Sequence, residues 1–137
     1  MPIAEFAVGQ SAELIRTLTE RDVMAFAEVT GDFNPVHVDA DAAAASSFGE
    51  RIVHGMLTAS LFSALLAMKL PGPGAIYLSQ SLRFLRPVKI GDTVTARVEI
   101  VSIDIARRRL TLATFVRNAR GKNVIDGDAV EIGRAHV

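Results

Sequence analysis

The chain has 137 residues, half of them hydrophobic, which suits a single domain with a substantial core. Lysine plus arginine and aspartate plus glutamate number 15 each, so the formal net charge is zero, whereas nucleic-acid-binding proteins usually have a basic excess; we expect no nucleic-acid partner. The lack of cysteine excludes disulfides, thiolate nucleophiles and cysteine-based metal sites.

Two segments bear on the location of the protein. Residues 1–6 contain no basic stretch before an apolar one, so we expect no signal peptide. The most apolar segment, 56–70, is shorter than the ~20 residues that span a bilayer. We therefore expect a cytoplasmic protein with no membrane partner. Zero net charge gives little repulsion between copies, which favours self-association.

The first part of the chain predicts a strand and then a capped helix. Residues 12–18 form the first expected strand. Thr19 suits a helix N-cap because acidic residues follow it in the first turn. Apolar residues then recur at helical spacing up to Thr30, and Gly31 suits the C-terminal end of the helix.

Two further helices are expected beyond a loop. Residues 34–35 are Asn-Pro and predict a loop, because the residue before proline avoids the helical region. Asp39 then caps a short alanine-rich helix that runs through Ala45. The longest helix covers about 55–69 and is ended by the Pro-Gly-Pro-Gly run at 71–74. It is apolar on almost all sides, so we expect it to be surrounded.

Four strand-like runs follow the long helix. In three of them apolar residues fall on one parity, which predicts one buried face: Ile76, Leu78, Leu82 and Phe84; Val94, Ala96, Val98 and Ile100; Leu110, Leu112, Thr114 and Val116. The fourth covers about 123–132, and turns are expected at 91–92 and 118–121. This order of elements predicts an α+β fold. The simplest packing is the hot-dog architecture, an antiparallel sheet wrapped around a long central apolar helix.

A loop carries the most informative polar residues. Asp32 and His37 lie five positions apart around the Asn-Pro pair, so a carboxylate and an imidazole could converge on one water molecule. A histidine beside a carboxylate titrates near neutral pH, which suits acid–base chemistry. Asn34 could orient the carboxylate or a substrate carbonyl. In the structural alternative, Asp32 and Asn34 only form turns and His37 is an ordinary loop or core residue.

The start of the long helix is the second candidate element. Gly55 has no side chain, so a substrate carbonyl could reach the unpaired N–H groups of the first turn, which would stabilise an enolate oxygen. The structural alternative is that Gly55 only permits close packing. We interpret His54 as a structural residue, because polar residues that flank helix starts often serve as caps.

Two serines lie within the apolar helix. Ser63 follows Gly55 by eight residues, near the face of Ala59, and could line the same pocket. Alternatively Ser60 and Ser63 each bond to a carbonyl one turn earlier. Leu65 and Leu66 could close an acyl pocket and favour short chains.

Other residues carry weaker signals. Most basic residues suit a solvated face, although some could contact the phosphates of a carrier such as coenzyme A: Arg83, Arg86, Lys89, Arg107, Arg108 and Arg109. We find no glycine-rich phosphate loop or dinucleotide fingerprint. His37 and His54 are too few and too loosely spaced to suggest zinc, so we expect no metal and no separate cofactor.

The motifs together resemble a known family. The sequence at 26–37 is FAEVTGDFNPVH, with Ala43 beyond it, and it resembles the signature of (R)-specific enoyl-CoA hydratases of the MaoC-like group. IVHGM at 52–56, SQSLRFLRPV at 79–88 and GDTV at 91–94 also resemble this family. The resemblance covers nearly the whole chain. It is closest to small bacterial hydratases that supply polyhydroxyalkanoate synthesis.

The resemblance implies an activity and roles for residues at matching positions. Asp32 and His37 would hold one water and add it across a trans-2-enoyl-CoA double bond, giving an (R)-3-hydroxyacyl-CoA of short-to-medium chain length. Gly55 N–H would polarise the thioester oxygen, and Asn34 and Ser63 would support the site. Coenzyme A would be part of the substrate. The family also implies a homodimer of hot-dog protomers.

Three alternatives stay open. A dehydratase of 3-hydroxyacyl groups on an acyl carrier protein would use the same residues and differ only in its carrier surface. A hot-dog thioesterase would not need Asp32 and His37 in this form. A non-catalytic acyl-CoA binding module would have no use for an acid–base pair.

The C-terminal end departs from the expected alternation. We assign 1–130 to one MaoC-like hot-dog domain and treat the heptapeptide EIGRAHV at 131–137 as an atypical tail. It resembles the translation of a sequencing adapter, and our hypothesis is that it is an artefact. His136 therefore receives no function.

Overall fold

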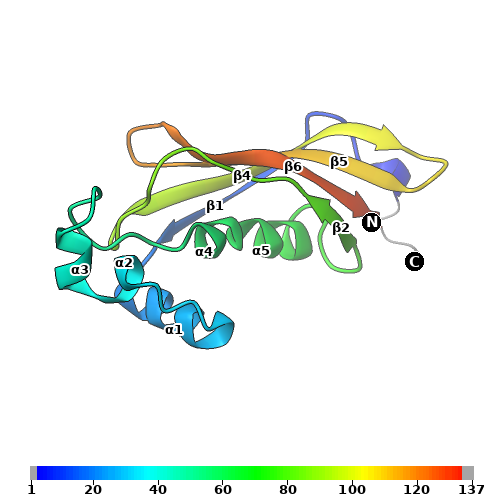
Figure 1. Cartoon of the computed structure of the whole chain (residues 1–137). Helices are drawn as coiled ribbons and strands as arrows, with labels where there is room; N and C mark the ends of the chain where they lie inside the picture. The colour runs from blue at the N-terminus through cyan, green and yellow to red at the C-terminus, as the bar shows by residue number, and fades with distance from the viewer. Residues whose placement is uncertain (1–2, 134–137) are drawn as a thin grey trace.

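Alternating apolar residues build a six-stranded antiparallel sheet (Figure 1). The structure is a computed structural model that describes residues 3–133. The strands are β1 (Ser11–Thr17), β2 (Ile76–Gln80), β3 (Arg83–Phe84), β4 (Thr93–Asp104), β5 (Arg109–Arg117) and β6 (Asn123–Ile132). Their order is β1-β4-β5-β6-β2, and the short β3 also pairs with β6. The sheet thus has β1 at one edge and β2 at the other.

The α-helices lie on one side of the sheet (Figure 1). The helices are the 3₁₀ helix η1 (Ile3–Glu5) and the α-helices α1 (Glu20–Thr30), α2 (Pro35–Val38), α3 (Ala40–Ala44), α4 (Gly55–Ala59) and α5 (Leu61–Met68). The sheet curves over α4 and α5, while α1, α2 and α3 lie together at one end of the molecule. The predicted α+β hot-dog architecture is confirmed. None of the helices within residues 3–133 is both long and apolar enough to cross a bilayer.

The core lies between the sheet and α5. Its sheet side consists of the predicted alternating residues of β4 and β5, all at most 1% exposed: Val94, Ala96, Val98, Ile100, Leu110, Leu112, Thr114 and Val116. Its helix side consists of Leu61, Phe62, Leu65 and Leu66. Full burial of such a side chain contributes roughly 1.5–3 kcal/mol, so this layer is the main source of stability.

Local capping explains where the early helices begin and end. The Thr19 side chain accepts from Asp22 N–H and the Asp22 carboxylate accepts from Thr19 N–H, a capping box that starts α1. Gly31 ends α1 with φ 81°, a left-handed conformation that glycine adopts without strain. Asp39 caps α3 as predicted.

Two helical predictions were wrong in part. Residues 35–38 form the helix α2 and not a loop, because Asn34 is its N-cap and Pro35 occupies the first helical position, where proline is favoured. The long helix divides at Ser60, and it is not surrounded in the single chain. Met56 and Met68 are 56% and 71% exposed, so only one face of α4–α5 is buried.

The predicted burial of the first alternating run was also wrong. Ile76, Leu78 and Phe84 are 44–53% exposed, because β2 and β3 lie at the margin of the sheet and α5 does not cover them.

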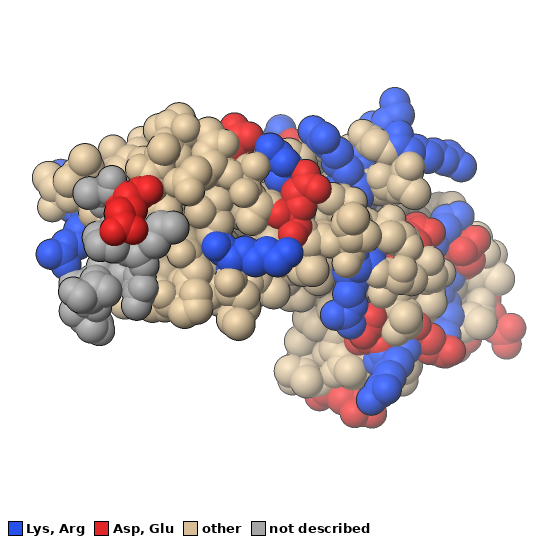
Figure 2. Space-filling model, turned by 180° about the vertical axis from the view of Figure 1, so that it is seen from behind, with Lys and Arg blue, Asp and Glu red and all other residues tan. Residues whose placement is uncertain are grey.

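On the face shown in Figure 2, the end that holds α1–α3 carries acidic and basic side chains side by side, whereas the opposite half is largely uncharged.

The C-terminal strand buries one carboxylate. β6 continues through Glu131 and Ile132, and Glu131 is only 2% exposed opposite Tyr77 of β2. Among residues 3–133 its Oε2 has no hydrogen-bond partner, and burial raises the pKa of Glu131 to about 7. Burial, and secondarily the charge of Glu131, raises the pKa of Tyr77 to about 12. Residues 134–137 of the expected tail, including His136, lie outside the described residues.

We predict that Glu131 makes the protein less stable as pH rises. The folded carboxyl keeps its proton up to about pH 7, whereas the unfolded one loses it near 4.5. The free energy of unfolding should therefore fall between these two values, by up to about 3 kcal/mol. Glu131→Gln should abolish this fall and exceed the parent protein by about 1–3 kcal/mol at pH 8, measured by urea denaturation.

Glu28→Gln is the matched control, because Glu28 is exposed on α1. It should leave the pH profile unchanged. A parent protein whose stability is flat between pH 4.5 and 7, or a Glu131→Gln variant no more stable at pH 8, would contradict the prediction.

Candidate active site

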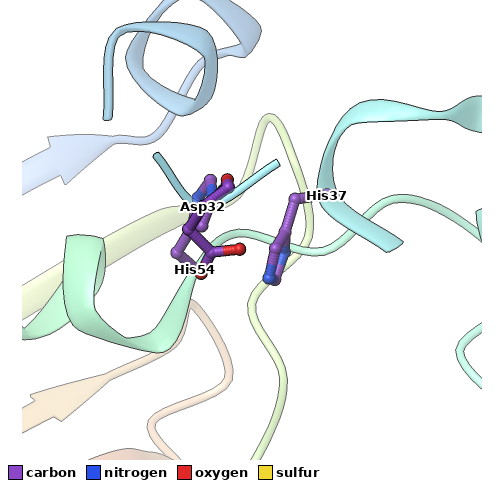
Figure 3. Close-up of side chains that lie close together, drawn as sticks. All are labelled: Asp32, His37 and His54. Atoms are coloured by element: carbon purple, nitrogen blue, oxygen red, sulfur yellow. Dashed lines mark hydrogen bonds between the residues drawn. The ribbon is translucent and has the colours of Figure 1, made fainter. Parts of the chain in front are cut away.

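The candidate site forms where the α1–α2 loop meets the start of α4. Asp32 lies in that loop, His37 lies on α2 and His54 is the residue before α4. Figure 3 shows the three side chains gathered at this junction. One carboxylate oxygen and one ring nitrogen from each histidine all lie within 4.8 Å of one another. The two predicted residues are thus brought together, with His54 added to them.

Short-range hydrogen bonds shape the loop that holds Asp32. Thr30 Oγ1 accepts from the N–H of Asp32 at 3.2 Å, and Asp32 Oδ1 accepts from the N–H of Asn34 at 3.2 Å. Asn34 Oδ1 in turn accepts from the N–H of Val36 and starts α2. Asn34 therefore supports the site through its backbone and its cap, and its amide does not reach the cavity described below.

The ring of His37 is held by a backbone carbonyl. His37 is 9% exposed, and its Nδ1 lies 2.8 Å from the carbonyl oxygen of Ile52. A carbonyl only accepts, so Nδ1 carries the hydrogen and the other nitrogen, Nε2, keeps a free lone pair in the neutral ring. That nitrogen is the one able to exchange a proton with water or substrate.

Arg51 holds the backbone of the same residue. Its Nε donates to the carbonyl of His37 at 2.7 Å, and its Nη1 forms an ion pair with Glu20 at 2.6 Å. The Arg51 side chain is 15% exposed, so its bond to the His37 carbonyl is partly shielded from solvent, whereas the Glu20 partner is 66% exposed. The segment before α4 thus binds both the ring and the backbone of His37.

His54 contacts both members of the predicted pair. Its Nε2 lies 3.0 Å from the backbone carbonyl of Asp32, and its ring stacks on that of His37 with centroids 4.0 Å apart and planes at 27°. It makes no side-chain cap bond, so the expected capping role was wrong. The sequence signal for this histidine was only its place before Gly55.

These donors do not form a good metal centre. A lone pair of an imidazole nitrogen lies in the plane of its ring, and the two rings are stacked face to face. The free lone pairs of His37 Nε2 and His54 Nδ1 therefore do not converge on one ion. The arrangement suits an acid–base pair better than a metal site.

A cavity of about 450 Å³ opens beside the pair. The polar residues of its lining are Asp32, both histidines, Thr58 and Arg86. The rest of the lining is apolar and consists of Phe48, Ile52, Val53, Gly55, Met56, Phe84, Leu85, Pro87, Val88 and Ile125. A mainly apolar cavity with a few converging polar groups is typical of a site for a small molecule or acyl chain.

Gly55 lies at the cavity wall as the first residue of α4. A Cβ atom there would come within 2.7 Å of Cδ1 and Cε1 of the Phe84 ring, so a side chain at position 55 fits only if that ring shifts. The first N–H groups of a helix have no acceptor within the helix and can face a ligand oxygen.

Other predicted site residues lie elsewhere. Ser63 is on the exposed side of α5 and does not line the cavity of the single chain. Leu65 and Leu66 are core residues at 1% exposure and do not line it either. The cavity instead uses residues 84–88, where sequence analysis had pointed only to Arg86 as a candidate phosphate contact and to the resemblance at 79–88.

Most of the basic residues have partners within the chain. Arg83 pairs with Asp126, Lys89 pairs with Glu50, and Arg107 pairs with Asp104. Arg86 donates from Nη1 to the carbonyl of Asn123 and is the basic residue that lines the cavity.

Comparisons with known proteins agree with this geometry. A family model described as "MaoC like domain" matches residues 5–119. An (R)-specific enoyl-CoA hydratase of Rhodospirillum rubrum is 49% identical over 121 residues, covering 88% of this chain and 83% of the relative.

Two solved structures share both sequence and fold. The unliganded R-hydratase PhaJ1 of Pseudomonas aeruginosa is 49% identical with a TM-score of 0.93, covering 98% of this chain and 86% of that chain. An (R)-hydratase from Aeromonas caviae involved in PHA biosynthesis is 46% identical with a TM-score of 0.91, covering 93% and 96%. The chain belongs to the MaoC-like dehydratase family.

Proposed function

We propose that the chain is an (R)-specific enoyl-CoA hydratase. It adds water to a trans-2-enoyl-CoA to give an (R)-3-hydroxyacyl-CoA and catalyses the reverse dehydration. The observation that carries this proposal is the convergence of Asp32 and His37 at one cavity, with a carboxylate oxygen and an imidazole nitrogen within 4.8 Å of each other. A water hydrogen-bonded to both groups fits that separation. The relatives described above support the substrate class.

The two side chains divide the proton transfers between them. The water oxygen bonds to C3 of the enoyl group while one residue of the pair takes a proton from the water. The other residue helps to deliver a proton to C2, and the water proton replaces it, so the pair ends the turnover in the protonation state in which it began. Electron density moves to the thioester oxygen between these events. The pair exchanges protons as a coupled unit, so we assign the catalytic role to Asp32 and His37 together.

Gly55 is assigned to the thioester oxygen. Its backbone N–H lies in the first turn of α4 and at the cavity wall, where a donor stabilises the developing enolate. Asn34 supports the site by donating its N–H to Asp32. Ser63 does not line the cavity of the single chain, so its expected supporting role has no structural support there.

The proposed pathway follows from the same substrate class. We infer that the product supplies monomers for polyhydroxyalkanoate synthesis, as the relation to the Aeromonas caviae enzyme suggests. A cytoplasmic location stays a prediction.

We predict that the protein hydrates crotonyl-CoA to the (R) product. Loss of the conjugated enoyl absorbance gives the rate, and chiral analysis gives the configuration. Asp32→Asn and His37→Gln should each lower turnover by at least ~100-fold, because each removes one proton-transfer group. Asp41→Asn, on an exposed position of α3, is the matched control and should stay close to the parent rate.

The alternatives give different outcomes in the same assay. No hydration of short or medium enoyl-CoAs would defeat the proposal, and release of free thiol would indicate a thioesterase. A much higher kcat/KM with the same acyl group on an acyl carrier protein would indicate the carrier-protein dehydratase. Parent-like turnover of either pair variant would overturn the catalytic assignment.

We predict that Gly55→Ala lowers turnover at least ~10-fold without unfolding the protein. The methyl group would stand where the thioester oxygen reaches the backbone. Stability should change by no more than about 1 kcal/mol, because alanine favours the helix and the half-exposed Phe84 ring can move. Steady-state kinetics and urea denaturation measure the two effects.

The double variant Gly55→Ala/Phe84→Ala is the control for ring displacement, measured beside Phe84→Ala alone. If the moved ring caused the loss, the alanine at position 55 would have no effect in the Phe84→Ala background. A persistent loss there supports the oxyanion role, and parent-like turnover of Gly55→Ala refutes it.

We propose a homodimer that pairs through β2. This strand contacts β6 on one side and no other strand within residues 3–133. Its residues Ile76, Tyr77 and Leu78 are 39–49% exposed, and the strand has no charged residue. A sheet edge that stays free usually carries charges, as β1 does with Glu13 and Arg16. A second copy would cover this apolar edge.

Sedimentation analysis should therefore find twice the 14.7 kDa mass of the chain. Leu78→Lys should shift the protein toward monomer, because the lysine would lie at the paired edge. Ile15→Lys is the matched control, since Ile15 is 67% exposed on the opposite edge strand β1. A monomeric parent protein, or a Leu78→Lys variant that stays dimeric like Ile15→Lys, would contradict the interface.

A further inference from the structure

We propose that His54 is a positioning residue that holds the backbone of Asp32 and the ring of His37 in place for proton transfer. The inference rests on the proposed function, because Asp32 and His37 are catalytic only within it. His54 itself has no assigned contact with the reacting atoms. It would act through its two neighbours.

The first contact sets the position of the α1–α2 loop. His54 Nε2 lies 3.0 Å from the carbonyl oxygen of Asp32. The carbonyl can only accept, so Nε2 must carry the hydrogen. This bond joins the residue before α4 to the loop 22 positions earlier, and it holds the Asp32 backbone while leaving its carboxylate free.

The second contact sets the ring plane of His37. The two imidazoles stack with centroids 4.0 Å apart, and the Ile52 carbonyl holds the Nδ1 of His37 in that plane. His54 also contacts Phe26 of α1, with ring centroids 4.8 Å apart. Three elements thus support the His54 ring, and a ring so constrained limits the rotation of the ring stacked on it.

His54 is built to hold position and not to carry protons. It is 2% exposed, and its one donor nitrogen already serves Asp32. Its other nitrogen, Nδ1, is buried without a partner. A hydrogen at Nδ1 would have no acceptor there, so the geometry fits only the tautomer with the hydrogen on Nε2.

Two substitutions of His54 with side chains of different length separate the effect of the Nε2–H donor from that of side-chain size. His54→Gln places an amide N–H at the distance of Nε2 and should keep kcat within about 5-fold of the parent, because it still donates to Asp32. His54→Asn places its amide nearer the backbone, at the position of Nδ1, and should lower kcat roughly 10- to 100-fold with KM nearly unchanged. Ile100→Val, a core change on β4 outside the cavity lining, should leave kcat unaffected.

A double-mutant cycle tests whether the effect passes through Asp32. In an Asp32→Asn background, His54→Asn should cost no more than about 3-fold further, because the group it positions is already absent. A merely structural role would give the same loss in both backgrounds.

Nitrogen-15 NMR of histidine-labelled protein tests the geometry without any activity. The chain has three histidines, so His37→Gln and His54→Gln assign the two site signals. We expect the Nε2–H tautomer for His54 and the Nδ1–H tautomer for His37. This measurement on the parent protein decides the question even if the asparagine variant fails to fold.

The outcomes are distinct. A parent protein that fails to hydrate crotonyl-CoA defeats the proposed function, and with it the role of His54. If the parent is active, an Nδ1–H tautomer of His54, parent-like kcat in His54→Asn, or an equal loss in the Asp32→Asn background overturns the positioning role alone. Rescue by glutamine with non-additive losses supports it.

Discussion

The hydrogen bond from His37 Nδ1 to the carbonyl of Ile52 is the interaction on which the site depends. It joins α2 to the segment before α4, two parts of the chain that are 15 residues apart. Arg51 strengthens the connection by donating to the His37 carbonyl, and Val36 accepts from the N–H of Ile52. These bonds place the acid–base pair beside Gly55. The neighbouring Val53 N–H donates to the Val88 carbonyl, which ties the same segment to the chain that enters β4.

The parts of the fold that the sequence predicted are those set by local chemistry. The capping box of Thr19 and Asp22, the left-handed Gly31 and the Asp39 cap each need only residues within a few positions. The alternation in β4 and β5 was also reliable, because α5 covers their inner face. Failures began where burial depends on distant elements. Ile76 and Leu78 alternate like core residues, yet they lie at a sheet edge that no helix within residues 3–133 covers.

The site shows the same division. Asp32 and His37 were predicted together because a short loop and a proline-started turn of helix keep them close in sequence and in space. His54 was given a structural role because its contacts with Asp32 and His37 depend on the packing of α4 against the α1–α2 loop. Ser63 illustrates the opposite error. Helical periodicity placed it near the face of Gly55, but Ser63 is on the exposed side of α5 and does not line the cavity of the single chain.

Buried polar atoms without a hydrogen-bond partner have different consequences at the cavity and in β6. Among the described residues they are His54 Nδ1, Thr58 Oγ1 and Glu131 Oε2. The first two belong to residues that line the cavity, where a bound water that donates a hydrogen can supply the missing bond. Glu131 lies between β2 and β5 and does not line that cavity, so its missing bond only costs stability. The buried polar atoms at the cavity are thus compatible with the binding of substrate and water. The buried Glu131 carboxyl in β6 instead opposes folding as soon as it ionises.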